Sequence, residues 1–418
     1  KPYLGREILN QKYSPSLKLV SNGRNLSLRD ADGVIRKANE ISIVWQAISL
    51  DKTKIFARQK IGPLASFESA ERVANDLKDN GIESTIAHPL DWEVWVAGDI
   101  QIPKSIKSTY QKIQVSKVVV PHLDRDNGKI PLKGPITLHA PDGMHWENGI
   151  HKGPFSIQSD SYGSWTLVEH VNIERYLNGV VPYEIGSKSP MAALAAQAIL
   201  ARTWAIANSH RFQVDGYNLC SDTQCQVYKD PSKSSQKIKT AIKKTAGKIL
   251  TWNRKPINTV YHATNGGVMA SVDEAWSTNP VPYLQMRLDG PKHWSNEVDL
   301  PLSNEKYLKS FLFSKSEAFG SDHPLFRWER TIDYTEISKQ LNQAQKVSSS
   351  FSPNKIKVLS RGRSGRVTSL KIVGESGSET FLKLDNIRRV FRQLPSTLFV
   401  VKEIKEGKWL FSGGGFGH

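Results

Sequence analysis

One acidic side chain, Glu184, stands in the apolar run VVPYEI of residues 180–185, directly before an alanine-rich segment. We interpret this run as strand-like. A single carboxyl group can act first as a general acid and then as a general base, provided that apolar neighbours raise its pKa and keep it protonated near neutral pH. The alternative is a structural pair between Glu184 and Arg202, which would lower the pKa of the carboxyl group and make it a poor acid.

The alanine-rich segment predicts a helix over residues 189–209. Ser189 can act as its N-cap, Pro190 suits the first helical position, and the residues that follow are almost all good helix formers. Small side chains cover much of its surface, so we expect it to be buried. Gln197 and Arg202 are polar side chains in its middle, and each needs a partner there. Both are candidate substrate contacts, while a structural salt bridge stays open for Arg202.

A second candidate segment reads YHATNGG over residues 261–267. The pair Gly266 and Gly267 permits close approach of the backbone to a sugar. Tyr261, Thr264 and Asn265 offer an aromatic face and hydrogen-bonding groups to the same ligand. Taken without further support, the pattern is that of a hairpin turn.

The composition limits the class of partner. The chain has 418 residues, enough for two or three domains, and 57 Lys+Arg against 40 Asp+Glu give a formal net charge of +17. This charge favours anionic partners such as nucleic acid, anionic lipid or an acidic wall polymer. No recognition helix or zinc-finger pattern is visible, which disfavours nucleic acid. The longest apolar runs fall short of the roughly 20 residues that span a bilayer.

The order of predicted elements indicates an α+β protein. After an N-terminal extension (residues 1–40), residues 41–103 read as strand, helix, strand, strand, with Ser66 as helix N-cap and Gly81 as its stop. Short strands alternate with turns from 104 to 170, before the alanine-rich helix. We therefore predict a small βαββ module over 41–103 and a β-rich domain with one buried alanine-rich helix over 104–418.

Several segments, in this order, resemble one protein family. They are ERYLNGVVPYEI (174–185), ALAAQA (193–198) with ARTWA (201–205), CSDTQCQVY (220–228), YHATNGG (261–267), VPYL (281–284), LPSTLF (394–399) and the closing GGGFGH (413–418). The chain from about residue 130 to its end is thereby similar to the SpoIID/LytB family, which includes a peptidoglycan lytic transglycosylase of sporulation and amidase enhancers. The resemblance implies a catalytic role for Glu184 and a substrate-lining role for the loop 261–267.

The implied reaction explains why one acid is enough. A lytic transglycosylase protonates the leaving oxygen, and the 6-hydroxyl of N-acetylmuramic acid closes on the anomeric carbon as a 1,6-anhydro ring. Ordinary glycosidases place two carboxyl groups about 5 to 9.5 Å apart because one must act as nucleophile or as base toward water. Here the same group can be acid first and base second, acting on glycan strands that include strands already stripped of peptide.

One departure from the family pattern bears on activity. Ala195 stands where family enzymes often carry a lysine that could orient the substrate. This favours the runner-up function, a non-catalytic amidase enhancer that binds glycan or a cell-wall amidase. A glycan-binding cell-wall scaffold is a third reading.

The two cysteines, Cys220 and Cys225, allow three states. Some family members bind zinc near this segment, but Gln224 stands where a histidine is expected and His210 is too distant in sequence to be assigned. Two thiolates alone do not complete a tetrahedral zinc site. We rank a disulfide first, two thiols second and zinc third, and expect no cofactor.

The segment 41–103 also resembles half of a SPOR domain, a module that binds glycan strands lacking stem peptides. A purely structural α+β module can have the same order of strands and helix, so this alternative stays open. The family resemblance implies a bacterial protein of the periplasm or cell wall. The chain begins at Lys1 without methionine, so we expect a removed signal peptide or anchor. Expected partners are glycan strands, an amidase and an anionic membrane surface, with no nucleic acid.

Overall fold

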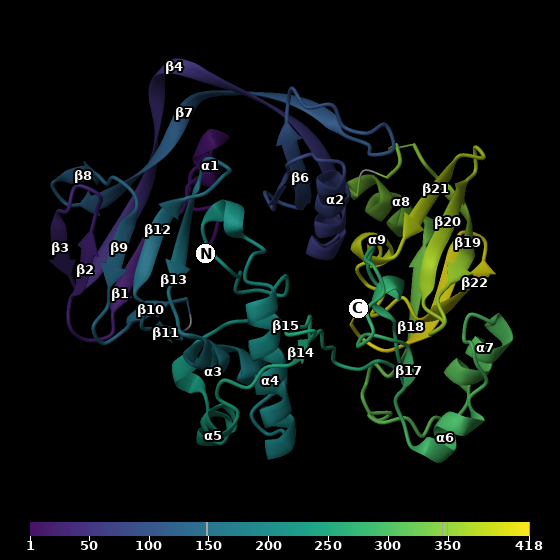
Figure 1. Ribbon diagram of the computed structural model, residues 1–418. Coiled ribbons are helices and arrows are strands. Elements are labelled where there is room, and N and C mark those ends of the chain that lie inside the picture. The colour runs from purple at the N-terminus through teal and green to yellow at the C-terminus, as the bar shows by residue number, and fades with distance from the viewer. Residues whose placement is uncertain (148, 345, 349, 418) are drawn as a thin grey trace. The chain divides into compact units, whose positions relative to one another are not determined.

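The computed structural model describes residues 1–147, 149–344, 346–348 and 350–417 (Figure 1). The chain divides into two compact units. Unit 1 comprises Lys1–Ile61, Ser84–Pro89 and Trp95–Val260, and unit 2 comprises Gly62–Glu83, Leu90–Val94 and Tyr261–His418. The predicted module 41–103 thus contributes residues to both units, and its limits stay a prediction.

Unit 1 contains two antiparallel sheets that share one hydrophobic core. Buried side chains alternate along their strands, as in β1, because successive residues point to opposite faces. The first sheet includes, in order, β11 (Gly149–His151), β10 (Met144–Trp146), β1 (Leu17–Ser21) and β4 (Glu40–Leu64), with β7 (Thr109–Arg125) paired to β4 and β8 (Gly128–Pro131) to β7. The second has the order β13 (Trp165–Glu169), β12 (Phe155–Ser159), β9 (Ile136–His139), β2 (Leu26–Arg29) and β3 (Ile35–Ala38).

Three helices of unit 1 enclose a second core. They are α3 (Ile173–Glu184), α4 (Met191–Ala207) and α5 (Gln236–Lys244). The interpretation of residues 180–185 as strand-like is wrong, because residues 180–184 complete α3 and Ile185 is its C-cap. Asn172 caps α3 by accepting from the Arg175 N–H at 2.9 Å, and buried Tyr176, Leu177, Val180 and Val181 recur at helical spacing.

The alanine-rich helix exists, but its predicted start is wrong. Pro190 occupies the N-cap position of α4, and no side chain caps the helix. The Ser189 hydroxyl instead donates to the Ile185 carbonyl at 2.8 Å, just beyond the end of α3. Ser189 therefore serves the end of one helix rather than the start of the next, and one face of α4 is buried while Ala192 and Ala196 stay exposed.

Unit 2 combines helices and antiparallel strands around two cores. The chain as a whole thus mixes helices with antiparallel sheets, which confirms the α+β class. The predicted cap of α2 (Phe67–Asp79) is also confirmed, because Ser66 accepts from the Ser69 N–H at 3.2 Å. The other α-helices and strands that lie wholly in unit 2 are β16 (Val268–Met269), β17 (Arg287–Leu288), α6 (Lys292–Glu297), α7 (Glu305–Phe313), β18 (Arg327–Asp333), α8 (Tyr334–Gln343), β19 (Pro353–Arg361), β20 (Val367–Gly374), β21 (Glu379–Lys383), α9 (Asp385–Val390), β22 (Phe399–Lys405) and β23 (Lys408–Gly414). Unit 1 also contains α1 (Arg6–Leu9), β14 (Thr251–Trp252) and β15 (Lys255–Pro256).

The order β4, α2, β5 (Thr85–Ala87), β6 (Trp92–Ala97) agrees with the predicted strand, helix, strand, strand. The likeness to a SPOR domain stays a prediction. Among the described residues, no helix is both long enough and apolar enough to cross a membrane.

A buried carboxylate anchors the start of α2 within unit 2. Asp385 is 8% exposed, and its Oδ2 accepts hydrogen bonds from the hydroxyls of Ser66 at 2.5 Å and Ser69 at 2.9 Å. Burial nevertheless raises the pKa of Asp385, and these hydrogen bonds only partly oppose the rise. The ionised form of Asp385 therefore reduces the stability of the folded protein.

We predict that Asp385→Asn raises the unfolding temperature at pH 7. The amide oxygen can still accept from both serines, while the buried charge is removed. Because the folded pKa of Asp385 lies above its unfolded value near 4, the wild type loses stability as the pH rises through that interval, whereas the variant does not.

Calorimetric unfolding at pH 4 and pH 7 measures this difference, which should shrink at the lower pH. Asp333→Asn is the matched control, because Asp333 is an exposed cap of α8 whose pKa is lowered by its hydrogen bonds. A variant that is less stable than wild type at pH 7 would contradict the argument.

Candidate functional site

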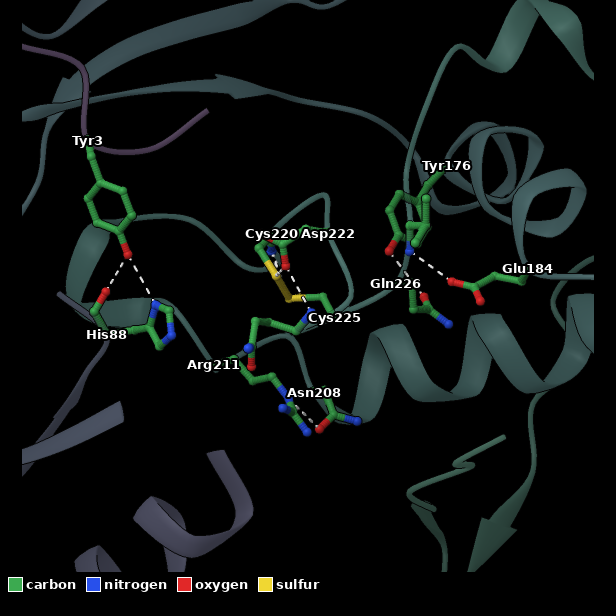
Figure 2. Close-up of a disulfide and its surroundings, with 12 residues drawn as sticks. Tyr3, His88, Tyr176, Glu184, Asn208, Arg211, Cys220, Asp222, Cys225 and Gln226 are labelled. Carbon is green, nitrogen blue, oxygen red and sulfur yellow. Dashed lines mark hydrogen bonds between the residues drawn. A yellow bond between two sulfur atoms is a disulfide. The ribbon is translucent and has the colours of Figure 1, made fainter. Parts of the chain in front are cut away.

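Glu184 is the last residue of α3 and is half-buried. Its Oε1 accepts a hydrogen bond from the backbone N–H of Val227 at 2.8 Å (Figure 2). The segment 226–229 therefore holds one carboxylate oxygen in place. A backbone donor of this kind favours the ionised carboxylate, so the apolar neighbours must outweigh it if Glu184 is to carry a proton.

The segment 226–229 reaches α3 because Gly179 has no side chain. The Lys229 N–H donates to the Gly179 carbonyl at 3.0 Å. A Cβ atom at position 179 would lie 2.4 Å from a ring carbon of Tyr228 and 2.5 Å from the carbonyl oxygen of Lys229. The contact that places Val227 next to Glu184 thus requires a glycine in the middle of α3. A glycine inside a helical segment indicates such a close approach, but we did not predict one from Gly179.

The two cysteines form a disulfide in the loop that precedes this segment (Figure 2). This is the first of the three predicted states. The loop is closed further where the Tyr228 N–H donates to the Ser221 carbonyl at 3.1 Å and the Cys225 N–H donates to the Asp222 carbonyl at 3.0 Å. Within the described residues, no group of three or more His, Cys, Asp or Glu side chains is arranged to hold a metal ion.

Tyr176 joins α3 to the same loop. Its hydroxyl donates to Oε1 of Gln226 at 3.1 Å (Figure 2). Its ring stacks on that of Tyr228 with centroids 5.2 Å apart. Burial and the nearby charge of Glu184 raise the pKa of Tyr176, so it remains a hydrogen-bond donor at neutral pH. Neither Tyr176 nor Gln226 was predicted, because their roles depend on contacts between distant segments.

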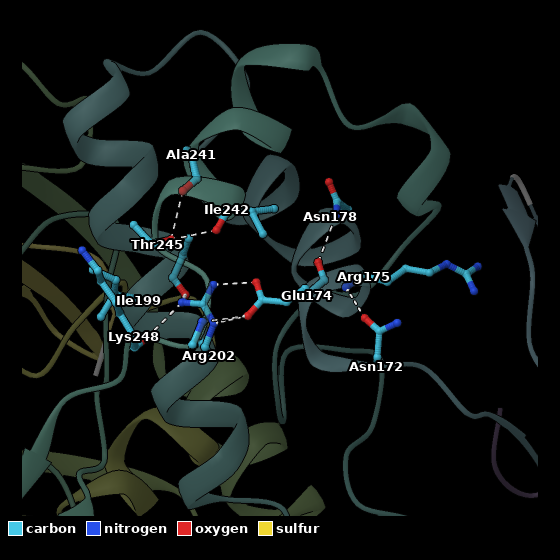
Figure 3. A network of polar contacts seen from close by, with 12 residues as sticks. Asn172, Glu174, Arg175, Asn178, Ile199, Arg202, Ala241, Ile242, Thr245 and Lys248 are labelled. Atoms are coloured by element: carbon cyan, nitrogen blue, oxygen red, sulfur yellow. Dashed lines mark hydrogen bonds and ion pairs between the residues drawn. The ribbon is translucent and has the colours of Figure 1, made fainter.

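Arg202 lies in a structural network rather than beside Glu184. It is 1% exposed, and its Nε and Nη2 donate to Glu174 at 2.9 and 2.7 Å, while Nη1 donates to the Lys248 carbonyl at 3.0 Å (Figure 3). Burial by itself would raise the pKa of Glu174, but the hydrogen bonds from Arg202 and from the Gly247 N–H bring it below its ordinary value. The carboxylate that Arg202 needs is Glu174, at the start of α3.

Gln197 presents a different situation on the same helix. Its side chain is 7% exposed, and within the described part of the chain its Nε2 has no hydrogen-bond partner. Ala195, which stands where family enzymes often carry a lysine, is half-buried. An unpartnered buried amide is unfavourable in the unliganded protein, which keeps Gln197 a candidate for contact with a ligand.

The second candidate segment belongs to unit 2, whereas Glu184, Gln197 and Arg202 belong to unit 1. Thr264 and Asn265 are buried, and Asn265 donates to Oδ2 of Asp289 at 2.7 Å. These two residues line a hollow of about 520 Å³ together with Asp289 and His323. Tyr261 is half-buried at the start of the segment.

The closing GGGFGH motif packs on this segment. Thr264 and Phe416 exchange two backbone hydrogen bonds of 3.3 and 2.7 Å. Gly266 has a φ of +71°, and a Cβ atom there would lie 2.7 Å from the backbone nitrogen of Gly415. The segment 261–267 and the closing motif thus approach each other closely at Gly266 and Gly415, where a side chain would not fit. His418, the last residue of the closing motif, lies outside the described residues.

Two arginines that were not predicted as site residues donate hydrogen bonds to backbone carbonyls of the same loop. Arg366 donates to the carbonyls of Val268 at 3.0 Å and Asn265 at 3.2 Å, and Arg327 donates to that of Gly266 at 2.9 Å. Burial lowers the pKa of each guanidinium to about 10, so both stay charged at neutral pH. Backbone carbonyls are the partners here, and they leave no pattern in the sequence.

Comparison with known proteins assigns parts of the chain. Residues 161–252 match the family described as Stage II sporulation protein, and residues 270–418 match a family described as Domain of unknown function (DUF8618). The first match contains Glu184, Gln197, Arg202 and both cysteines, while the loop 261–267 lies between the two matches.

Three relatives are informative. Stage II sporulation protein D of Bacillus subtilis (strain 168) is 32% identical over 133 residues, or 28% of this chain and 38% of that protein. The Amidase enhancer of the same strain is 35% identical over 113 residues, or 27% of this chain and 15% of that protein. An uncharacterized protein of Brachyspira hyodysenteriae is 26% identical over 258 residues, or 60% of this chain and 59% of that protein. The chain thus spans less than two thirds of each relative.

We predict that Glu174→Gln destabilises the folded protein by roughly 3 kcal/mol, because it leaves the buried charge of Arg202 without its carboxylate. The pKa of Glu174 is lowered in the folded state, so the stabilisation is present above the unfolded pKa near 4.3 and is lost as the pH falls. Denaturant unfolding at pH 7 and pH 3.5 measures both effects.

Glu305→Gln is the control, because the pair of Glu305 with Lys309 is exposed on both sides and is expected to contribute less than about 1 kcal/mol. If Glu174→Gln and Glu305→Gln lowered the free energy of unfolding equally, the network around Arg202 would contribute no more than an exposed ion pair.

Gly179→Ala is expected to destabilise by about 1–3 kcal/mol through its clash with Tyr228 and Lys229, although alanine elsewhere in a helix is favourable. Denaturant unfolding measures the loss, and the amide resonance of Val227 reports whether its contact with Glu184 shifts. Asn178→Ala on the same helix is the control, since that side chain makes only a local bond to the Glu174 carbonyl. An unperturbed Val227 resonance in Gly179→Ala would disprove the packing argument.

Proposed function

Because this chain contains a domain of the SpoIID/LytB family, we propose that it is a peptidoglycan lytic transglycosylase that uses Glu184 as its general acid and base. The observation that carries the proposal is the placement of this carboxyl group. It lies at the end of α3 within the matched region, and the N–H of Val227 fixes its Oε1.

The reaction needs one proton carrier at this position. With Oε1 accepting from Val227, the proton of the neutral acid resides on Oε2. Glu184 gives this proton to the oxygen that links N-acetylmuramic acid to the next sugar, and the bond from the anomeric carbon to that oxygen breaks. The 6-hydroxyl of the same sugar then bonds to the anomeric carbon, and Glu184 takes up the hydroxyl proton. No water is consumed, and the acid is regenerated.

We assign substrate contacts to Gln197 and to the loop of Tyr261, Thr264, Asn265, Gly266 and Gly267. The unpartnered amide of Gln197 supports its assignment, because a ligand acetamido or hydroxyl group would accept its buried N–H. Arg202, predicted earlier as a candidate contact, has its donors directed to Glu174 and a carbonyl, which supports a positioning role instead.

The setting fits the same proposal. The disulfide between Cys220 and Cys225 is the expected state in an oxidising compartment outside the cytoplasm. A net charge of +17 favours association with a polyanionic wall or with an anionic membrane surface. We propose glycan strands as the substrate, including strands stripped of stem peptides, with the SPOR-like segment as a glycan-binding module. No cofactor takes part in the proposed chemistry.

The second candidate is an amidase enhancer that binds glycan without cleaving it. Two observations favour it: one relative is named Amidase enhancer, and Ala195 replaces a cation that would orient the substrate. In that case the partner is a cell-wall amidase, and Glu184 is not required for the effect.

We predict that Glu184→Gln abolishes the release of 1,6-anhydro fragments, because glutamine cannot donate a proton to the leaving oxygen. The expected loss is at least about 100-fold, the scale of general acid catalysis. Mass spectrometry of purified glycan strands, with and without stem peptides, measures the products.

Glu305→Gln, an exposed glutamate, serves as the matched control and should keep full activity. Strands that remain intact with the wild-type protein, together with stimulation of an amidase by both wild type and Glu184→Gln, would replace the enzyme proposal with the enhancer function.

A further inference from the structure

Unit 1 contains a cleft of about 1040 Å³ that the proposed chemistry does not use. It lies among the β10–β11 hairpin, β13, α3, the end of α4 and the segments 216–221 and 228–233. Tyr183 and Tyr228, which line it, directly neighbour Glu184 and Val227 in sequence, but neither Glu184 nor Val227 is part of its lining. Its volume lies at the upper end of the range that small-molecule sites occupy, roughly 300 to 1,000 Å³.

A buried carboxylate organises one side of this cleft. Oε2 of Glu169 accepts from the hydroxyl of Tyr228 at 2.9 Å and contacts Nδ1 of His151 at 2.8 Å, and Oε1 accepts from Arg175 at 3.2 Å. Burial by itself would raise the pKa of Glu169, but the interactions with His151, Tyr228 and Arg175 bring it below its ordinary value. Glu169 is thereby saturated, so it orients its neighbours and is not itself available to a ligand.

Glu169 orients His151, whose other ring nitrogen, Nε2, is available to a ligand in the cleft. Since Nδ1 donates to a carboxylate, the neutral ring carries its proton on Nδ1 and has an acceptor at Nε2. Among the described residues, none forms a hydrogen bond with Nε2. The side chain is 9% exposed and lines the cleft, so its Nε2 suits a donor group of a bound molecule.

A second lining residue supports the presence of a ligand. Thr166 is 2% exposed, and its hydroxyl has no hydrogen-bond partner within the described part of the chain. A buried hydroxyl without a partner is unfavourable unless a water or a ligand satisfies it. The other walls carry Tyr176, Tyr183 and Tyr228. The charged side chains of the lining are Lys1, Lys229 and Lys233 against Glu147, Glu169 and Asp230, so the two signs balance.

We propose that this cleft binds a stretch of neutral N-acetylated oligosaccharide. Tyrosine rings suit the apolar faces of sugar rings, while His151 and Thr166 offer hydrogen bonds to hydroxyl or acetamido groups. The balance of charges in the lining favours a neutral ligand over an anionic or cationic one. The inference rests on the proposed function, since it makes the cleft a holding site for uncharged sugar units of the glycan, with lining residues next to Glu184 in sequence.

The test is calorimetric titration of the full chain carrying Glu184→Gln with tetra-N-acetylchitotetraose, a neutral oligosaccharide. His151→Asn should weaken binding about tenfold, because asparagine can keep the donor to Glu169 while Nε2 is lost. Thr166→Val should also weaken binding and leave the unfolding temperature unchanged or higher. His145→Asn is the matched control, since His145 is exposed on β10 and is not part of the lining.

Absence of binding, or equal binding by His151→Asn, Thr166→Val and His145→Asn, would overturn the inference. Binding of a neutral stem tetrapeptide in place of the oligosaccharide, with the same sensitivity to His151→Asn, would overturn the choice of ligand. Neither result depends on strand cleavage. If the oligosaccharide binds but the wild-type protein does not cleave strands, only the transglycosylase proposal is refuted. If strands are cleaved but the oligosaccharide does not bind, only the proposed binding in the cleft is refuted.

Discussion

The contact between α3 and the segment 226–229 is the constraint on which the site around Glu184 depends. It exists because position 179 carries only a hydrogen atom where any Cβ would meet Tyr228 and Lys229. Once that contact is made, Val227 reaches the carboxylate on one side and Tyr228 reaches Glu169 on the other. Packing at one glycine thereby couples two sets of polar groups that are distant from each other in sequence.

Within unit 1, buried charges have specific partners. Arg202 has Glu174, and Glu169 has His151 and Arg175. Such groups are unfavourable to bury unless each is paired, so they restrict how the surrounding segments can pack. Gln197 and Thr166 are among the buried polar side chains of the described residues that have an atom without a partner, and such atoms are informative about what the protein binds.

Local signals predicted part of this structure. Ser66 before a helical pattern located α2, alanine content located α4, and the two cysteines were correctly ranked as a disulfide. The family motifs pointed to Glu184. These features depend on a few neighbouring residues, and for that reason they can be recognised in one sequence.

Other features depend on contacts between distant segments and were missed. The apolar run of residues 180–185 was interpreted as strand-like, but a cap at Asn172 and packing against α4 make this segment helical up to Glu184. Nor did the sequence reveal that residues 17–38, placed in an N-terminal extension, supply β1, β2 and β3 of a two-sheet core.

The path of the chain between the two units has a consequence for biosynthesis. Helix α2 belongs to unit 2, yet the hydroxyl of Ser69 bonds to a carboxylate 316 residues later in the sequence. A ribosome releases α2 long before Asp385, so the hydrogen bonds between them can form only after all of the remaining unit 1 has been synthesised. Because unit 2 is built from segments on both sides of most of unit 1, no single cleavage separates the chain into the two units.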